Sequence, residues 1–259
     1  MSIHSCIQVE KQGRIALVWL NRPEAKNRFH REMVESLQSV MDEAEKDPEI
    51  SVVVIAAKGE VFCAGGDMGD YTSMSVGEIR GFWQEFIRLY VTIANLSKPT
   101  IAAVDGLVEG GGFTLFDACD MAVATSRAAF SAPEAKTGLG PIVVSVAMGR
   151  SLGRRKAMEL FCTGASLGAE EALRLGLINK LVPEGAAVKE ALALAKSMVA
   201  NNPSAIGLCK RLYQSCFAHD YADQLQRALD VLISMLKSED GLESAKSRRE
   251  NRQPKWTGR

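Results

Sequence analysis

The sequence predicts an α/β protein, and three observations support this. Several short runs, such as Val52–Ala57, are apolar on both faces and rich in β-branched residues, which is typical of strands covered on both sides. Longer segments such as Arg31–Lys46 place their apolar residues at helical spacing. Strands concentrate in the first half of the 259 residues, and helices dominate the last third. A chain of this length can bury a large core.

A strand, strand, helix order recurs loosely along the chain. A hairpin is expected first, because two apolar strands flank a polar turn that contains Gly13. Pro48 and Pro99 mark the ends of the first two helices. The expected strands are 7–10, 15–20, 52–57, 100–104, 121–124 and 129–131, and the expected helices are 31–46, 76–96, 113–120, 143–152, 154–162, 169–175, 188–201, 204–218 and 221–237. We expect a loop over 59–71 and a solvated tail over 247–259.

Composition excludes several classes of partner. Lys plus Arg number 31 and Asp plus Glu number 31, so the formal net charge is zero and gives no electrostatic reason to expect nucleic acid or an anionic membrane. No segment reaches membrane-spanning length without charges, and the N-terminus lacks the layout of a signal peptide. Cytoplasmic localisation is therefore expected.

The cysteines and histidines give no sign of a disulfide frame or a metal site. Six cysteines are scattered without a CxxC pair and mostly lie in apolar company, so we expect reduced, mostly buried thiols. The three histidines are far apart in sequence, and no metal site is expected.

The central segment of the chain is a run of three consecutive glycines, Gly110 to Gly112. They follow the apolar strand 100–104 and a turn, and they open a helix-like run over 113–120. Bare backbone amides at a helix N-terminus attract negative charge. The pattern favours a site for an oxyanion or a phosphate over a simple packing turn. It does not match a dinucleotide site, because the GxGxxG spacing is absent.

Two further segments share this character. VFCAGGDM, at positions 61–68, follows a buried strand and contains a second glycine pair. Ala132-Pro133-Glu134 precedes a glycine-rich loop, Gly138-Leu139-Gly140-Pro141.

Taken together and in order, these segments resemble the crotonase superfamily, the enoyl-CoA hydratases and isomerases. The resemblance runs from Asn21 to the end of the chain and includes VFCAGGDM, AAVDGLVEGGG, CDMAVAT, FSAPEAKTGLGP, LFCTGASLGAEEALRLGLINKLVP and SEDGLESAKSRRENRQPKW. It implies a crotonase-like spiral of ββα units over 1–200, which binds CoA and carries the catalytic site. It also implies a C-terminal helical oligomerisation region over 201–259, and homotrimers or dimers of trimers.

The resemblance further implies that the backbone amides of Gly66 and Gly111 hold the thioester carbonyl of an acyl-CoA. A thioester that becomes an enolate concentrates charge on one oxygen, and losing one such donor typically costs about 3–4 kcal/mol of barrier. No cofactor is expected beyond coenzyme A as part of the substrate. Its binding residues would be Ala25, Lys26, Ala64, Gly65, Gly66, Asp67 and Met68.

One acid–base group stands out. Two-glutamate hydratases carry their first glutamate two residues after the glycines, where this chain has Thr114, and their second at the position of Glu134. Apolar neighbours such as Phe130 would raise the pKa of Glu134 into a useful range. The alternative for Glu134 is a loop cap or a surface ion pair. Glu109 could face the pocket or solvent, of which solvent is favoured, and Asp120 is expected to support the fold through hydrogen bonds.

A single glutamate leaves the reaction open. A double-bond shift needs only one proton-transfer group, which argues for an isomerase. Some hydratases of the family also carry only the second glutamate, followed by a GLxP segment like 138–141, and on this basis a hydratase is favoured. A hydrolase, a lyase and a non-catalytic acyl-CoA-binding protein stay open. The candidates for the acyl pocket are Met68, Tyr71, Met74 and Trp83.

Overall fold

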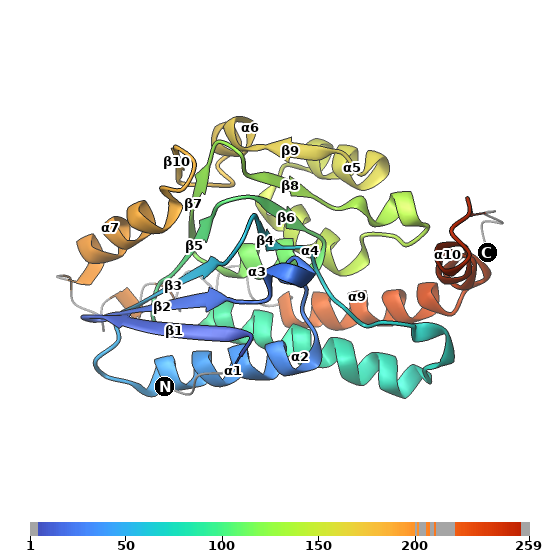
Figure 1. Ribbon diagram of the computed structural model, residues 1–259, viewed down its shortest axis with the longest axis horizontal. Helices are drawn as coiled ribbons and strands as arrows, with labels where there is room; N and C mark the ends of the chain where they lie inside the picture. The colour runs from blue at the N-terminus through green and yellow to red at the C-terminus, as the bar shows by residue number, and fades with distance from the viewer. Residues whose placement is uncertain (1–4, 200, 202–205, 208–209, 211–220, 255–259) are drawn as a thin grey trace.

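A computed structural model describes residues 5–199, 201, 206–207, 210 and 221–254 (Figure 1). Its strands form two sheets, in an α/β arrangement as expected. In the larger sheet the order is β1 (Ile7–Gln12), β2 (Ile15–Leu20), β3 (Val52–Ala57), β5 (Thr100–Val104), β7 (Met121–Thr125) and β10 (Lys180–Val182). In the smaller sheet it is β4 (Val61–Cys63), β6 (Leu107–Glu109), β8 (Ala129–Ser131) and β9 (Ser166–Gly168).

The chain winds as a spiral whose successive strands, from β3 to β8, alternate between the two sheets. β3, β5 and β7 join the larger sheet, and the strand that follows each of them, β4, β6 or β8, joins the smaller one. Successive strands within each set pair in parallel, because a helix or a helical turn of the spiral returns the chain between them. The strand ends that precede the glycine segments are therefore stacked side by side.

Helices cover both faces of the larger sheet (Figure 1). Residues of α1, α2 and α3 pack into the main core on one face, and α7 covers the other face through three buried alanines. α2 begins at a capping box in which Ser75 and Glu78 satisfy each other's backbone amides. The helices are α1 (Arg31–Lys46), α2 (Val76–Asn95), α3 (Gly111–Ala118), α4 (Ile142–Ser151), α5 (Arg154–Thr163), α6 (Ala169–Arg174), α7 (Ala187–Val199), α9 (Tyr221–Leu236) and α10 (Glu239–Arg249), with 3-10 turns η1 (Pro23–Ala25), η2 (Tyr71–Ser73) and η3 (Pro133–Thr137).

In the described part of the chain, no helix has the length and apolar character needed to cross a membrane.

Three expectations about the chain's path are wrong. The segment expected as a loop contains β4, and the turn after β5 contains β6; three-residue strands are too short to show an alternating pattern. The first residues of the expected solvated tail, 247–249, belong to the end of α10, and Ser247 is only 3% exposed. α10 has no apolar stripe, so periodicity could not reveal it.

The expected helix over 204–218 lies largely outside the described residues, and the division at residue 200 stays a prediction.

The C-terminal helices pack back onto the body of the chain. α9 contributes Leu225, Leu229, Leu232, Ile233 and Leu236 to a third apolar cluster that includes side chains of α2 and α4. α10 contacts η2, where the Tyr71 hydroxyl donates a hydrogen bond of 2.7 Å to the carbonyl of Gly241.

The described cysteines are all free thiols, as expected, but they are not uniformly buried. Cys6 and Cys63 are buried, Cys119 is half-buried and Cys162 is exposed. Cys209 and Cys216 lie outside the described residues.

Candidate active site

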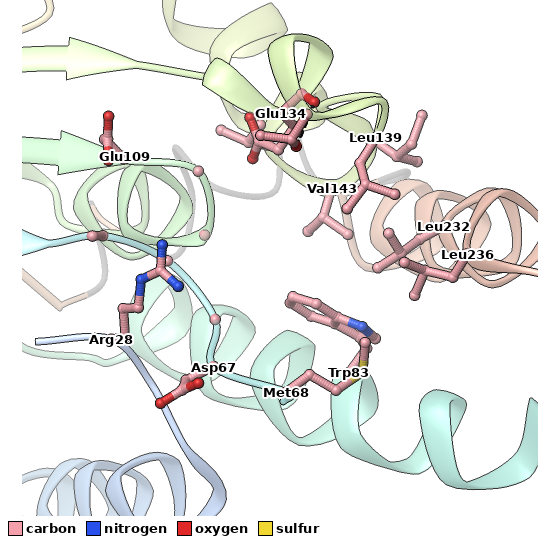
Figure 2. Close-up of a pocket in the computed structure, with 18 of the residues that line it drawn as sticks. Arg28, Asp67, Met68, Trp83, Glu109, Glu134, Leu139, Val143, Leu232 and Leu236 are labelled. Carbon is pink, nitrogen blue, oxygen red and sulfur yellow. Dashed lines mark hydrogen bonds between the residues drawn. The ribbon is translucent and has the colours of Figure 1, made fainter. Parts of the chain in front are cut away.

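A cavity of about 370 Å³ opens beside the ends of the smaller sheet (Figure 2). It collects segments that are far apart in the sequence, including the loop after β4, the start of α3, η3 and the loop after it, and single faces of α2, α4, α9 and α10. The lining residues are Arg28, Ala64, Gly65, Gly66, Asp67, Met68, Gly69, Tyr71, Trp83, Glu109, Gly110, Gly111, Pro133, Glu134, Thr137, Leu139, Gly140, Ile142, Val143, Val144, Leu232, Leu236 and Arg248.

The amide of Gly66 is held in a fixed direction by Phe29. The Phe29 N–H donates to the carbonyl of Gly65 at 2.8 Å, and the Asp67 N–H donates to the carbonyl of Phe29 at 2.7 Å. In a parallel bridge these bonds use the peptide groups on either side of Gly66, so its own N–H points away from Phe29. Trp83 packs closely on the other side, where a Cβ on Gly66 would lie 2.8 Å from the Trp83 ring.

The amide of Gly111 lies next to that of Gly66. Gly111 is the first residue of α3, so its N–H has no acceptor within the helix. A Cβ built on Gly111 would lie 3.5 Å from the nitrogen of Gly66, and one built on Gly65 would lie 3.2 Å from the nitrogen of Gly111. Within the described residues neither amide donates a hydrogen bond to another backbone group. Two free N–H donors therefore lie side by side at the cavity wall.

The other two positions of this turn, Gly110 and Gly112, require glycine for different structural reasons. Gly110 has φ 52° and ψ −124°, a backbone region open essentially to glycine. A Cβ at Gly110 would also lie 2.7 Å from Oε1 of Glu134, so the missing side chain makes room for the carboxyl group. Gly112 lets α3 approach β4 closely, because a Cβ there would lie 2.2 Å from the carbonyl oxygen of Cys63.

Glu134 brings a carboxyl group to the same wall. It lies on η3, and its Oε2 atom is buried without a hydrogen-bond partner among the described residues. Burial raises the pKa of Glu134 to about 7, and the nearby charge of Glu109 acts in the same direction. No ion pair joins it to a cation in the described structure. A carboxyl group with this pKa exchanges its proton readily near neutral pH.

The expectation that Glu109 faces solvent is wrong. Glu109 pairs in register with Ser131 across β6 and β8, so the two side chains share one face, and the Ser131 hydroxyl donates to Glu109 at 3.1 Å. Glu109 lines the cavity, although Figure 2 shows its side chain beside the glycine turn and not over Glu134. Thr114 is completely buried and does not line the cavity.

The predicted CoA-binding residues fall into two groups. Ala64 to Met68 line the cavity, whereas Ala25 and Lys26 lie outside its lining. The groups are joined by a hydrogen bond of 3.1 Å from the Ala64 N–H to the carbonyl of Lys26. Asp67 forms an ion pair with Arg22 at 2.8 Å, which braces the same loop.

The structure also places the candidates for the acyl pocket and the predicted structural residue Asp120. Met68, Tyr71 and Trp83 line the cavity, and Met74 does not. Asp120 supports the fold as expected, since its carboxylate accepts hydrogen bonds from the backbone and side chain of Thr100 at 2.7 and 2.9 Å.

Sequence reasoning missed Arg28 and the C-terminal contribution of Leu232, Leu236 and Arg248. Arg28 follows the polar loop 21–27 directly, which is a usable signal. No local pattern marks the other three.

Comparison with known proteins gives the family. The enoyl-CoA hydratase/isomerase family model matches residues 10–259. The chain belongs to the enoyl-CoA hydratase/isomerase family. It is 34% identical over 205 residues to the short-chain-enoyl-CoA hydratase of Clostridium acetobutylicum, covering 78% of each chain. It is 30% identical over 250 residues to the mitochondrial enoyl-CoA hydratase domain-containing protein 3 of Danio rerio, covering 96% of this chain and 86% of that one.

Solved structures of the enoyl-CoA hydratase/isomerase family agree with this fold. Carnitinyl-CoA hydratase from Mycobacterium avium superposes with a TM-score of 0.83 at 33% identity, covering 99% of this chain and 100% of the other. The expected crotonase-like fold is therefore confirmed, as is an enzyme of the hydratase or isomerase type.

Proposed function

We propose that this member of the family is an enoyl-CoA hydratase that uses Glu134 as its single acid–base group. The observation that carries the proposal is the juxtaposition of two free backbone N–H groups, from Gly66 and Gly111, with a buried carboxyl group whose pKa is raised to about 7. Two such donors suit one thioester oxygen that becomes negatively charged.

The proposed reaction balances with one carboxyl group. The Glu134 carboxylate takes a proton from water while the water oxygen bonds to the β-carbon of a 2-enoyl thioester. The electron pair of the double bond moves to the thioester oxygen, where the two amides stabilise the enolate. Glu134 then returns its proton to the α-carbon as the enolate collapses to the 3-hydroxyacyl thioester.

Double-bond isomerisation is the second candidate. The burial of Thr114 away from the cavity favours it, because the position that carries the first glutamate in two-glutamate hydratases supplies no carboxylate here. An isomerase would use Glu134 to remove a proton at one carbon and return it at another.

The substrate and setting belong to the same proposal. The CoA moiety would lie along residues 25–26 and 64–68, and coenzyme A would enter as part of the substrate only. We also propose a homotrimer or dimer of trimers, which follows from the family resemblance, and a cytoplasmic location.

The test compares the wild type with Glu134→Gln on 2-enoyl and 3-enoyl thioesters. We expect water addition to 2-enoyl-CoA in the wild type, and a loss of at least about a hundredfold in kcat in the variant with CoA-thioester binding retained. The exposed Glu170→Gln on α6 serves as the control and should retain full rate. Conversion of 3-enoyl to 2-enoyl thioester without hydration would establish the isomerase. Near-normal turnover by Glu134→Gln, or no proton exchange at the α-carbon in heavy water, would overturn the proposal.

A further inference from the structure

One part of the cavity, which we call the outer arm, is lined by Met68, Tyr71, Trp83 and Arg248. Its wall between these residues is mostly aliphatic, with side chains from α4 and α9. Figure 2 shows the indole of Trp83 facing this wall, with Met68, Leu232 and Leu236 around its nitrogen end. An arm of this composition suits a carbon chain.

The outer arm contains a buried donor without an acceptor. Nε1 of Trp83 is buried, and no hydrogen-bond partner for it exists among the described residues. An indole N–H is a donor only, and a buried donor without an acceptor is unfavourable. The surrounding aliphatic side chains offer no oxygen, so a ligand in the arm is the natural source of an acceptor.

The outer arm also carries a cation. The side chain of Arg248 is exposed; its Nε donates to the carbonyl of Ser244 at 3.3 Å, and the guanidinium also neighbours the Tyr71 hydroxyl. No carboxylate in the described structure forms an ion pair with Arg248, whereas the adjacent Arg249 pairs with Asp70 at 3.0 Å. A guanidinium has five donors in a planar fork that matches a carboxylate.

The acidic side chains of the cavity lie elsewhere. Asp67 is paired with Arg22, and Glu109 and Glu134 lie at the glycine turn. The outer arm therefore has one cation and no negative side chain of its own among the described lining residues.

We propose that the outer arm selects acyl chains that end in a carboxylate, with Arg248 as the partner cation and the indole N–H of Trp83 as a second donor. A chain ending in methyl would leave both donors without an acceptor from the ligand, and a neutral hydroxyl would leave the charge of Arg248 unmatched. The exposed position of Arg248 allows the carboxylate to keep part of its hydration. This inference rests on the proposed acyl-CoA function and specifies its substrate class.

Binding of saturated CoA thioesters tests the inference without any turnover. Isothermal titration calorimetry would compare six- and eight-carbon acyl chains that end either in methyl or in carboxylate. We expect the carboxylate-ended chain to bind about tenfold more tightly at one or both lengths. Equal or weaker binding of the carboxylate-ended chain at both lengths would overturn the inference. Because no reaction is needed, a failed hydratase assay would leave this result readable.

Variants assign the preference to the two donors. Arg248→Gln should abolish most of the preference and leave binding of the methyl-ended chain within about twofold, and Arg248→Lys should restore part of it. Trp83→Phe keeps an aromatic ring and removes the N–H, so it should reduce the preference severalfold. Arg249→Gln is the matched control and should leave the preference intact. An equal loss for both chain types in Arg248→Gln would place Arg248 on the CoA moiety, and a loss of preference in Arg249→Gln would indicate general surface charge; either result would contradict the proposal.

Discussion

The two ends of the cavity are built in opposite ways. At the reacting end, the glycine turns at residues 65–66 and 110–112 offer backbone groups, and the neighbouring peptide groups are held by hydrogen bonds between strands and loops. At the outer arm, side chains from α2, α4, α9 and α10 form the wall. Main-chain geometry determines the shape of the reacting end, whereas side-chain packing determines the shape of the outer arm. A family can therefore keep one chemistry at the first end and vary the substrate at the second.

The largest effect should come from adding one methyl group at the reacting end. Gly110→Ala places a Cβ against the Glu134 carboxyl group and forces a non-glycine residue to φ 52°. We expect a loss of about 1–3 kcal/mol in the free energy of unfolding, and of about a hundredfold in kcat because the carboxyl group is displaced. Urea unfolding and steady-state kinetics measure the two.

Gly149→Ala provides the matched control. Gly149 lies in α4, and apart from its chain neighbours and its own helix backbone no atom of the described residues lies within 4 Å of an added Cβ. This variant should therefore be stabilised by about 0.5–1 kcal/mol with unchanged kcat. Equal effects of the two alanines would show that the reacting end tolerates backbone change.

An intermediate effect is expected at the outer arm. Leu236→Ala removes a 2%-exposed side chain from the cavity wall. We therefore expect kcat/KM to fall about tenfold for eight-carbon chains and to change by no more than about twofold for four-carbon chains. The exposed Leu242→Ala on α10 should change neither value. An equal loss at both chain lengths would mean that the outer arm does not hold the acyl chain.

The smallest effect should be on the titration of Glu134. Glu109→Gln removes a like charge, so the pKa of Glu134 should fall below about 7, by less than about one pH unit. Since the proposed first step needs the carboxylate, the rising limb of the pH–rate profile should move to lower pH. No movement, or movement to higher pH, would show that the two carboxyl groups are not coupled.

The same shift has a consequence for stability. The pKa of Glu134 is raised from an ordinary value of 4.5, so its contribution to stability is present below pH 4.5 and is lost as the pH rises to about 7. Glu109→Gln should reduce that loss, which urea unfolding at pH 5 and pH 8 would reveal.

The sequence predicted the reacting end better than the outer arm for a physical reason. Glycines and a glutamate at strand ends are local signals, and strand order brings them together. The inward position of Glu109 depends on its register with Ser131, which no local pattern reveals. Leu232 and Leu236 have the same apolar spacing as any packed helix, so their place in the cavity wall follows only from how α9 docks against α2 and α4.

The two backbone hydrogen bonds of Phe29 determine when the amide of Gly66 loses its conformational freedom. Because they anchor the peptide groups before and after Gly66, the entropy of aiming that amide is lost once, when the chain folds, and not again in each catalytic cycle. Phe29, which is completely buried and lies 37 positions before Gly66, thus fixes the direction of a donor without contacting the ligand that the donor would bind.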